Sequence, residues 1–187
     1  MKKCLFLFIG VLFGLISCKN KINCPEFDEK ILSWIPYQKN DVIELYSQSD
    51  DSTIEFLIES MVVNHKTDYE RNTKCGRCND DIFINNYDSD FYVEIYLYDR
   101  IAGHQSYKII DTYFSTYSEV KNYLFESKEY DLVRVFETND TQGTFRKLIV
   151  AEGIGIIGLV DSNGNSWVLK TSAPTKKPNI MINKTSC

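Results

Sequence analysis

Two cysteines separated by two residues, Cys75 and Cys78 in the segment KCGRCND, carry the sharpest chemical signal in the chain. A Cys-x-x-Cys pair is typical of redox dithiols, in which one thiol is activated at the N-terminus of a helix. Here the flanking residues are polar, and Asp80 and Asp81 bring negative charge that disfavours a thiolate. We therefore interpret the pair as a structural disulfide, and a thiol–disulfide redox protein is the alternative.

Histidines could convert this cysteine pair into a metal site. The chain contains two, His65 and His104, and with Cys75 and Cys78 they would supply the two nitrogen and two sulfur ligands of a tetrahedral zinc site. Neither histidine stands at a fixed ligand spacing from the cysteines. We therefore predict no metal and no cofactor, and a zinc-binding module is a second alternative.

Three glycines in the segment GIGIIG, Gly153, Gly155 and Gly158, satisfy the dinucleotide-binding pattern G-x-G-x-x-G. That pattern requires a helix after the third glycine, because the helix N-terminus holds the pyrophosphate. Here the segment LVDSNGNS follows, which predicts a strand and a hairpin turn at Asn163–Gly164. We interpret the glycines as sites of a bulge or of close packing across a sheet. Catalytic motifs of serine hydrolases and zinc proteases are also missing, so we predict a non-enzymatic protein.

Tyrosine is abundant, with 12 residues, and three of them alternate with apolar residues in FYVEIYLYDR. Residues two apart point to the same face of a strand, so Tyr92, Tyr96 and Tyr98 are predicted to share a face, with Tyr107 and Tyr113 added by the adjoining strand. Exposed tyrosines offer rigid contact area with a hydrogen-bonding tip, which suits a protein or glycan partner. The alternative is cross-strand pairing that only stabilises the sheet.

The N-terminus begins with Lys2 and Lys3, continues with an apolar run over 5–16, and ends in LISC at Cys18. The run is shorter than the about 20 residues that a membrane-spanning helix needs. A charged start and a short apolar run describe a secretory signal peptide. The residues LISC resemble the bacterial lipobox, whose cysteine receives lipid chains.

The lipobox resemblance implies that residues 1–17 are a signal peptide and are removed. It implies that Cys18 carries palmitate-type acyl chains and anchors the protein to a membrane of the cell envelope. Lys19, in place of an aspartate, favours the outer membrane. An ordinary cleaved signal and an uncleaved anchor are the alternatives.

Four cysteines follow the lipobox, and an even number in an exported chain predicts disulfide bonds. We predict the pairs Cys75–Cys78 and Cys24–Cys187. The second pair would close a loop around the whole domain, for which the chain-entropy model predicts about 4–5 kcal/mol of stabilisation. Other pairings of the four cysteines stay open.

Charge and length restrict the domain organisation and the partners. The formal charge is −5 and becomes −7 when the two lysines of residues 1–17 are removed. An acidic chain without a dense basic segment argues against a nucleic-acid partner. We predict a lipid-anchored tether over 18–24, a single mainly β domain over 25–172 and a polar C-terminal tail over 173–187.

The spacing of apolar residues along the chain predicts the strands and helices on which these residues lie. A period of two predicts strands with one wet and one dry face, as in antiparallel sheets, for the segments VIELYS, STIEFLIESMVV, FYVEIYLYDR, SYKIIDTYF, DLVRVFET, FRKLIVAEG and SWVLKTS. A first helix is predicted over 25–35. A capping box of Thr116 and Glu119 predicts a second in TYSEVKNYLFES. The acidic segments NDD and YDSD are predicted to be turns.

The predicted fold class is α+β, mainly an antiparallel β meander in a curved sheet or open barrel, with one or two short helices. A two-sheet sandwich is the alternative. The layout of lipobox, helix ending in Trp34–Tyr37, meander and closing hairpin resembles that of small bacterial envelope lipoproteins. This resemblance implies no catalytic residue.

Overall fold

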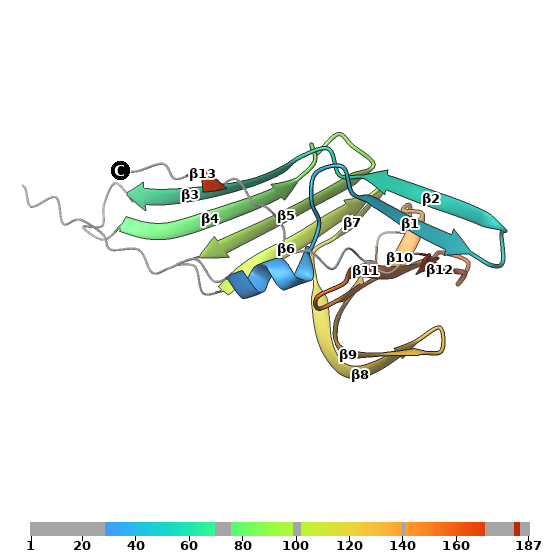
Figure 1. Ribbon diagram of the computed structural model, residues 1–187. Helices are drawn as coiled ribbons and strands as arrows, with labels where there is room; N and C mark the ends of the chain where they lie inside the picture. Colours follow the sequence, from blue (N-terminus) through green and yellow to red (C-terminus); the bar gives the residue numbers. More distant parts are fainter. Residues whose placement is uncertain (1–28, 70–75, 99–101, 140, 171–181, 184–187) are drawn as a thin grey trace, which may run out of the picture.

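The computed structural model describes residues 29–69, 76–98, 102–139, 141–170 and 182–183. Within these residues the chain forms one short 3-10 helix, η1 (Glu29–Trp34), and thirteen strands in two sheets (Figure 1). No helix in the described ranges has the length and apolar character needed to cross a membrane.

The first sheet has seven strands in the order β2-β1-β12-β11-β10-β9-β8. All its neighbours are antiparallel. Its strands are β1 (Val42–Ser47), β2 (Ser52–Leu57), β8 (Tyr117–Phe125), β9 (Lys128–Glu137), β10 (Phe145–Ala151), β11 (Gly155–Asp161) and β12 (Ser166–Leu169).

The second sheet has six strands in the order β13-β3-β4-β5-β6-β7. Only β13, which lies in the range predicted to be a tail, runs parallel to its neighbour, β3. Its strands are β3 (Met61–Tyr69), β4 (Gly76–Ile84), β5 (Phe91–Tyr98), β6 (Ala102–Ile109), β7 (Thr112–Phe114) and β13 (Ile182–Asn183).

The prediction of a mainly antiparallel β fold is confirmed. Alternation places Val93, Ile95 and Leu97 of β5 on the dry face, with 4 % exposure or less, as the period of two requires. The chain uses two sheets, and neither closes into a barrel. The two-sheet alternative therefore describes the architecture better than a single curved sheet.

The predicted second helix is wrong, because its segment forms strand β8. Apart from Asn122, the residues of β8 pair with β9 from Tyr117 opposite Phe136 to Phe125 opposite Lys128. The hairpin turn at Glu126–Ser127 has left-handed backbone at both residues, with φ of 45° and 64°. Asn-Gly is the usual sequence for such a turn, and Glu-Ser does not resemble it. The sequence therefore gives no indication of a hairpin here, and the helical spacing of its apolar residues predicts a helix instead.

Two further strand boundaries differ from the predictions. The segment NDD is not a turn: Asn79, Asp80 and Asp81 lie inside β4, and all three are buried. The segment SYKIIDTYF is two strands, β6 and β7, joined by a tight turn at Ile110 and Asp111. Ile110 has a φ of 55°, which β-branched residues rarely adopt, so its sequence predicts a continuing strand.

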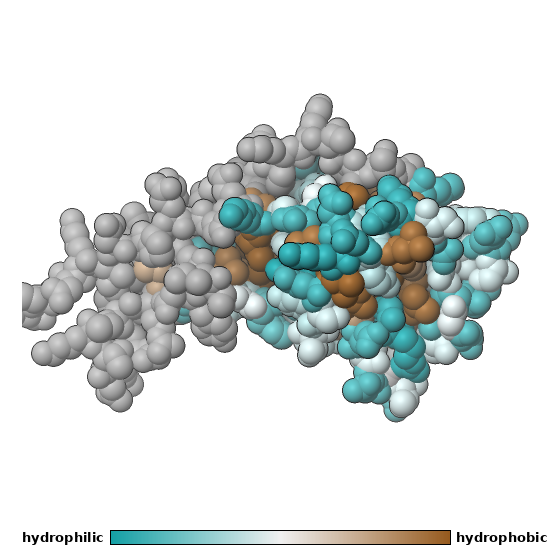
Figure 2. Space-filling view, turned by 90° about the horizontal axis from the view of Figure 1, so that it is seen from below, coloured by the Kyte–Doolittle hydropathy of each residue, from teal (hydrophilic) through white to brown (hydrophobic). Residues whose placement is uncertain are grey.

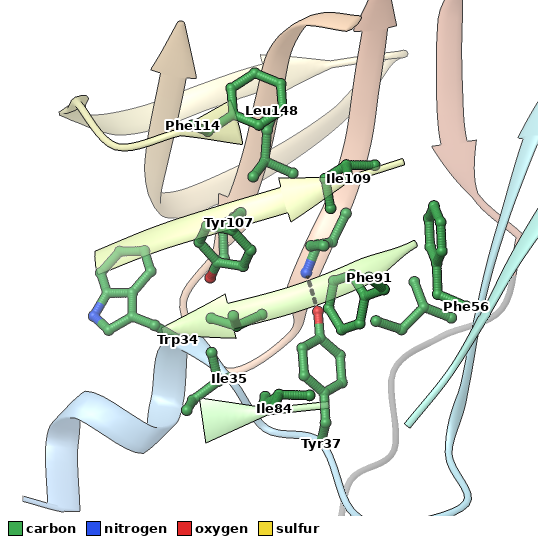
Figure 3. Close-up of a cluster of buried hydrophobic side chains, with 14 of the residues drawn as sticks. Trp34, Ile35, Tyr37, Phe56, Ile84, Phe91, Tyr107, Ile109, Phe114 and Leu148 are labelled. Carbon is green, nitrogen blue, oxygen red and sulfur yellow. Dashed lines mark hydrogen bonds between the residues drawn. The ribbon is translucent and has the colours of Figure 1, made fainter. Parts of the chain in front are cut away.

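The main hydrophobic core lies between the two sheets and includes residues just after η1 (Figure 3). Tyr37 crosses this core: its ring meets Phe91 of β5 edge-on, and its hydroxyl oxygen accepts a hydrogen bond of 2.6 Å from the N–H of Ile156 in β11. Burial raises the pKa of Tyr37 well above its ordinary value. A neutral phenol therefore links both sheets inside the core.

A second, smaller core lies on the other face of the seven-stranded sheet. The β8–β9 hairpin curls in Figure 1, and Asn122, with a φ of 52°, lies in it. Phe125 at the hairpin end packs over Gly158 of β11, and Val133, Ile149 and Ile157 are fully buried beside it.

Seen from below, apolar patches interrupt the hydrophilic surface (Figure 2).

Candidate functional site

The strongest surface candidate is a group of aromatic residues on the outer face of the six-stranded sheet. We call Phe83, Tyr87, Tyr92, Tyr96 and Tyr113 the tyrosine surface. The strand register places Tyr92 of β5 opposite Lys108 of β6, which lies opposite Tyr113 of β7. The opposite face of the same strands forms the core, so the sheet supports the four rings that lie on strands, whereas Tyr87 lies in the turn between β4 and β5.

Aromatic contacts fix the orientation of the central rings. Phe83 stacks on Tyr92 with centroids 6.4 Å apart, and Tyr87 meets Tyr92 edge-on at 5.4 Å. Tyr92 is 7 % exposed, whereas Tyr87 and Tyr113 are 61 % and 43 % exposed. The surface therefore has a packed centre and two accessible flanks.

Two charged side chains complete this surface. The Nζ of Lys108 lies 5.1 Å from the centroid of the Tyr87 ring and donates hydrogen bonds to the carbonyl oxygens of Tyr87, at 2.8 Å, and Ser89, at 3.3 Å. Lys108 thereby holds the β4–β5 turn against the sheet. Burial, together with the charge and hydrogen bond of Glu94, raises the pKa of Tyr92 well above its ordinary value. The Tyr92 phenol therefore stays protonated.

The predicted tyrosine face is only partly what the structure contains. Tyr92, Tyr96 and Tyr113 share the outer face by register, but Tyr92 is buried by neighbouring rings. The placement of Tyr107 on this face is wrong: its side chain is fully buried in the core, against Phe136. The side chain of Tyr98, the last residue of β5, lies outside the described part of the chain.

The predicted cysteine sites lie mostly outside the described residues. Cys18, Cys24, Cys75 and Cys187 fall in ranges that the structure does not describe. Cys78 lies in β4, is 3 % exposed and is disulfide-bonded. Its partner is thus one of the cysteines outside the described ranges, and both predicted pairings stay predictions.

The two histidines do not meet in the fold. His65 lies in β3 and His104 in β6, with β4 and β5 between them. Three strand spacings separate their backbones by about 14 Å, which is too far for both to join one zinc ion with Cys78. Among the described residues no group of three or more histidine, cysteine or acidic side chains could hold a metal ion.

Two of the three glycines of GIGIIG, Gly155 and Gly158, are positions of close packing, as the sequence indicated, whereas Gly153 has open space around it. A Cβ atom on Gly155 would overlap the Tyr37 hydroxyl, and one on Gly158 would overlap the Phe125 ring. The pairing of β10 with β11 also shifts register beside these glycines, which marks a bulge or irregularity. Strand β11 begins at Gly155, so this segment has no helix that could hold a pyrophosphate.

A buried arginine between the sheets was not predicted from the sequence. Arg134 of β9 has a side chain 11 % exposed, and its guanidinium carbon lies 4.0 Å from the ring centroid of Trp34 and 4.6 Å from that of Tyr117. Its Nε and Nη2 both donate to Glu119 at 3.0 Å, and its Nη1 donates to Gln105 at 2.6 Å.

This arginine links the two sheets through Gln105 of β6, whose amide donates a 2.6 Å hydrogen bond to the Tyr107 hydroxyl. The guanidinium contacts two aromatic rings and donates a hydrogen bond from each of its three nitrogen atoms, so we assign Arg134 a structural role. A sequence signal was present, because alternation in DLVRVFET places Arg134 on the core face with Leu132 and Phe136.

Comparison of the chain with protein-family models, with curated proteins and with solved structures found no match.

Proposed function

We propose that the protein is a lipid-anchored, non-enzymatic protein of the bacterial cell envelope, and that its β domain binds a protein or glycan partner through the tyrosine surface. The lipobox resemblance at Cys18 supports the anchoring, and Lys19 favours the outer membrane. The observation that carries the binding proposal is the contrast between the packed ring of Tyr92 and the exposed rings of Tyr87 and Tyr113.

Rigid aromatic rings suit recognition because little side-chain freedom is lost when a partner binds. Tyrosine also combines apolar area with a hydroxyl group that can donate or accept a hydrogen bond. Lys108 and Glu94 add one charge of each sign beside the rings, which suits a polar partner.

Anchoring is tested by the intact mass of the full chain recovered from bacterial membranes. The expected mass is that of residues 18–187 plus lipid chains, and a Cys18→Ala variant should lose the lipid mass. A wild-type chain that keeps residues 1–17, or that lacks lipid, would contradict the anchoring proposal.

Partner binding is tested by a photo-cross-linking amino acid placed at Tyr87 in the full chain in intact cells. The matched control is the same group at Val42, which is 51 % exposed on the other sheet. A discrete cross-linked species at position 87 only is expected for a protein partner. For a glycan partner, retention on purified cell-wall sacculi should fall in a Tyr87→Ser/Tyr113→Ser variant. Equal results for both positions and unchanged retention would refute the binding proposal.

Mild reduction of Cys75 and Cys78 distinguishes the redox alternative from a structural disulfide. A structural disulfide should resist a reductant that opens a catalytic one, since the potentials of the two kinds differ. Two freely alkylated thiols would favour the redox protein, and two thiols protected until a chelator is added would favour the zinc-binding module.

A further inference from the structure

Strand β8 is an open edge of the seven-stranded sheet. It pairs with β9 on one side, and no described strand lies on its other side. It has nine residues, against six in β2 at the opposite edge, and its side chains at Ser118, Glu119, Lys121 and Asn122 are exposed. An open edge presents unpaired N–H and C=O groups that can accept a further strand.

Hydrogen bonds on the far side of β9 fix which of its residues face β8. The N–H of Thr138 donates to the carbonyl of Arg146, and the N–H of Glu152 donates to the carbonyl of Leu132. In an antiparallel pair, residues alternate between bonding to one neighbour and to the other. Even-numbered residues of β9 therefore bond to β10, and odd-numbered residues such as Val133 bond to β8.

The same alternation then determines which residues of β8 direct their backbone groups to β9 and which direct them to the open edge. Val120 lies opposite Val133, so its backbone groups point inward to β9. Glu119 and Lys121, on either side of it, must point their N–H and C=O groups to the open edge. A strand that adds to β8 must form hydrogen bonds with the backbone N–H and C=O groups of these two residues.

We propose that β8 pairs antiparallel with β8 of a second copy of this chain, with Val120 on the two-fold axis. In this register Glu119 of each copy lies opposite Lys121 of the other, which forms two ion pairs of opposite charge. The registers that place Glu119 or Lys121 on the axis bring like charges together, which is unfavourable. Placing Ser118 on the axis leaves Lys121 without an acidic residue opposite it.

One feature of the monomer favours this register, and a second limits its length. Arg134 holds the carboxylate of Glu119 through Oε1, while the side chain keeps 47 % exposure, so it is oriented before pairing. The left-handed backbone of Asn122, with a φ of 52°, interrupts the regular strand, so regular pairing in this register covers Glu119, Val120 and Lys121 of each copy. This is small beside the about 800 Å² that each partner buries in a standard interface, so we expect a weak, concentration-dependent dimer.

The proposal is independent of the tyrosine surface, and a Val120→Cys variant of the full chain tests it. Residues on the axis form a non-hydrogen-bonded pair with Cα atoms about 4.5 Å apart, within the range of a disulfide bond. Mild oxidation should therefore give a cross-linked dimer, identified by peptide mapping of the 120–120 link.

The matched control is Ser118→Cys, an exposed position on the same strand. In the proposed register the two thiols introduced by this control would stand about 14 Å apart along the strands, beyond the reach of a disulfide bond. Adding Lys121→Glu to Val120→Cys should lower the cross-linked fraction at least about five-fold, because two ion pairs become like-charge contacts. Equal cross-linking of Val120→Cys and Ser118→Cys, or no effect of Lys121→Glu, would overturn the register.

Sedimentation velocity of the unmodified chain tests the dimer without an added cysteine, in case Val120→Cys fails to fold. The wild type should sediment faster as its concentration rises, and Lys121→Glu should remove this dependence. A wild-type chain that stays monomeric up to about 1 mM, the range of a very weak complex, would overturn the proposal.

Discussion

The hydroxyl group of Tyr37 lies directly over Gly155 and accepts the N–H of Ile156 at 2.6 Å. The phenol fits here only because Gly155 has no Cβ, and Gly155 also has a φ of 86°. One tyrosine and one glycine therefore join the segment after η1 to the start of β11. Both sheets depend on this contact, since Tyr37 also packs on Phe91 of β5.

Gly155→Ala should lower the free energy of unfolding more than Gly153→Ala. Gly153 has a similar φ of 76° but no atom within 4 Å of an added Cβ, so it reports the backbone cost alone. We expect about 1 kcal/mol for Gly153→Ala and at least about 2 kcal/mol more for Gly155→Ala, because the latter also displaces a buried hydrogen bond. Urea denaturation measures both. Equal losses would show that Tyr37 moves aside without cost.

Arg134→Ala should lower the free energy of unfolding by about 3 kcal/mol, because it removes charge-assisted hydrogen bonds and contacts with two rings. Lys147→Ala is the matched control, since Lys147 forms a 3.0 Å ion pair with Glu137 in which both side chains are at least one-third exposed. That change should cost less than about 1 kcal/mol. Chemical denaturation compares them, and similar losses would contradict a structural role for Arg134.

Asp111 should stabilise the domain at neutral pH and lose this stabilising effect in acid. Burial alone would raise the pKa of Asp111, but hydrogen bonds from the N–H and hydroxyl of Thr144 and from the hydroxyl of Thr112 outweigh it and lower the pKa. A lowered folded-state pKa stabilises the protein above the unfolded-state value of about 3.9, and this contribution disappears as pH falls through the folded-state pKa.

The stability difference between the wild type and Asp111→Asn should therefore be largest near pH 7 and should shrink below about pH 4. Urea midpoints across this pH range measure it. The size will be modest because Asp111 is exposed. A difference that does not change with pH would mean that the carboxylate charge plays no part.

Tyr92→Ala should destabilise the domain far more than Tyr87→Ala. Tyr92 is 7 % exposed and contacts Phe83 and Tyr87, so its loss leaves a cavity that costs about 3 kcal/mol. Tyr87 is 61 % exposed, and its loss removes mainly one ring contact, worth about 1 kcal/mol. Thermal unfolding distinguishes them. A large loss for Tyr87→Ala would mean that this ring supports the fold and is a poor probe of binding.

Local patterns in the amino-acid sequence were enough to predict the β class, the dry face of β5 and the close packing at Gly155 and Gly158. The first two follow from the alternation of apolar and polar residues, and the third follows from the strand and hairpin that come after GIGIIG in place of a helix. Pairing with the neighbouring strand β9 made 117–125 a strand, because these contacts outweigh a capping box. The left-handed turn at Glu126–Ser127, which joins the two strands, has no sequence signal. Packing between the sheets also decides that Tyr107 is buried in the core and that Arg134 bonds to both sheets. A pattern shows which residues share a face, but only packing shows what covers that face.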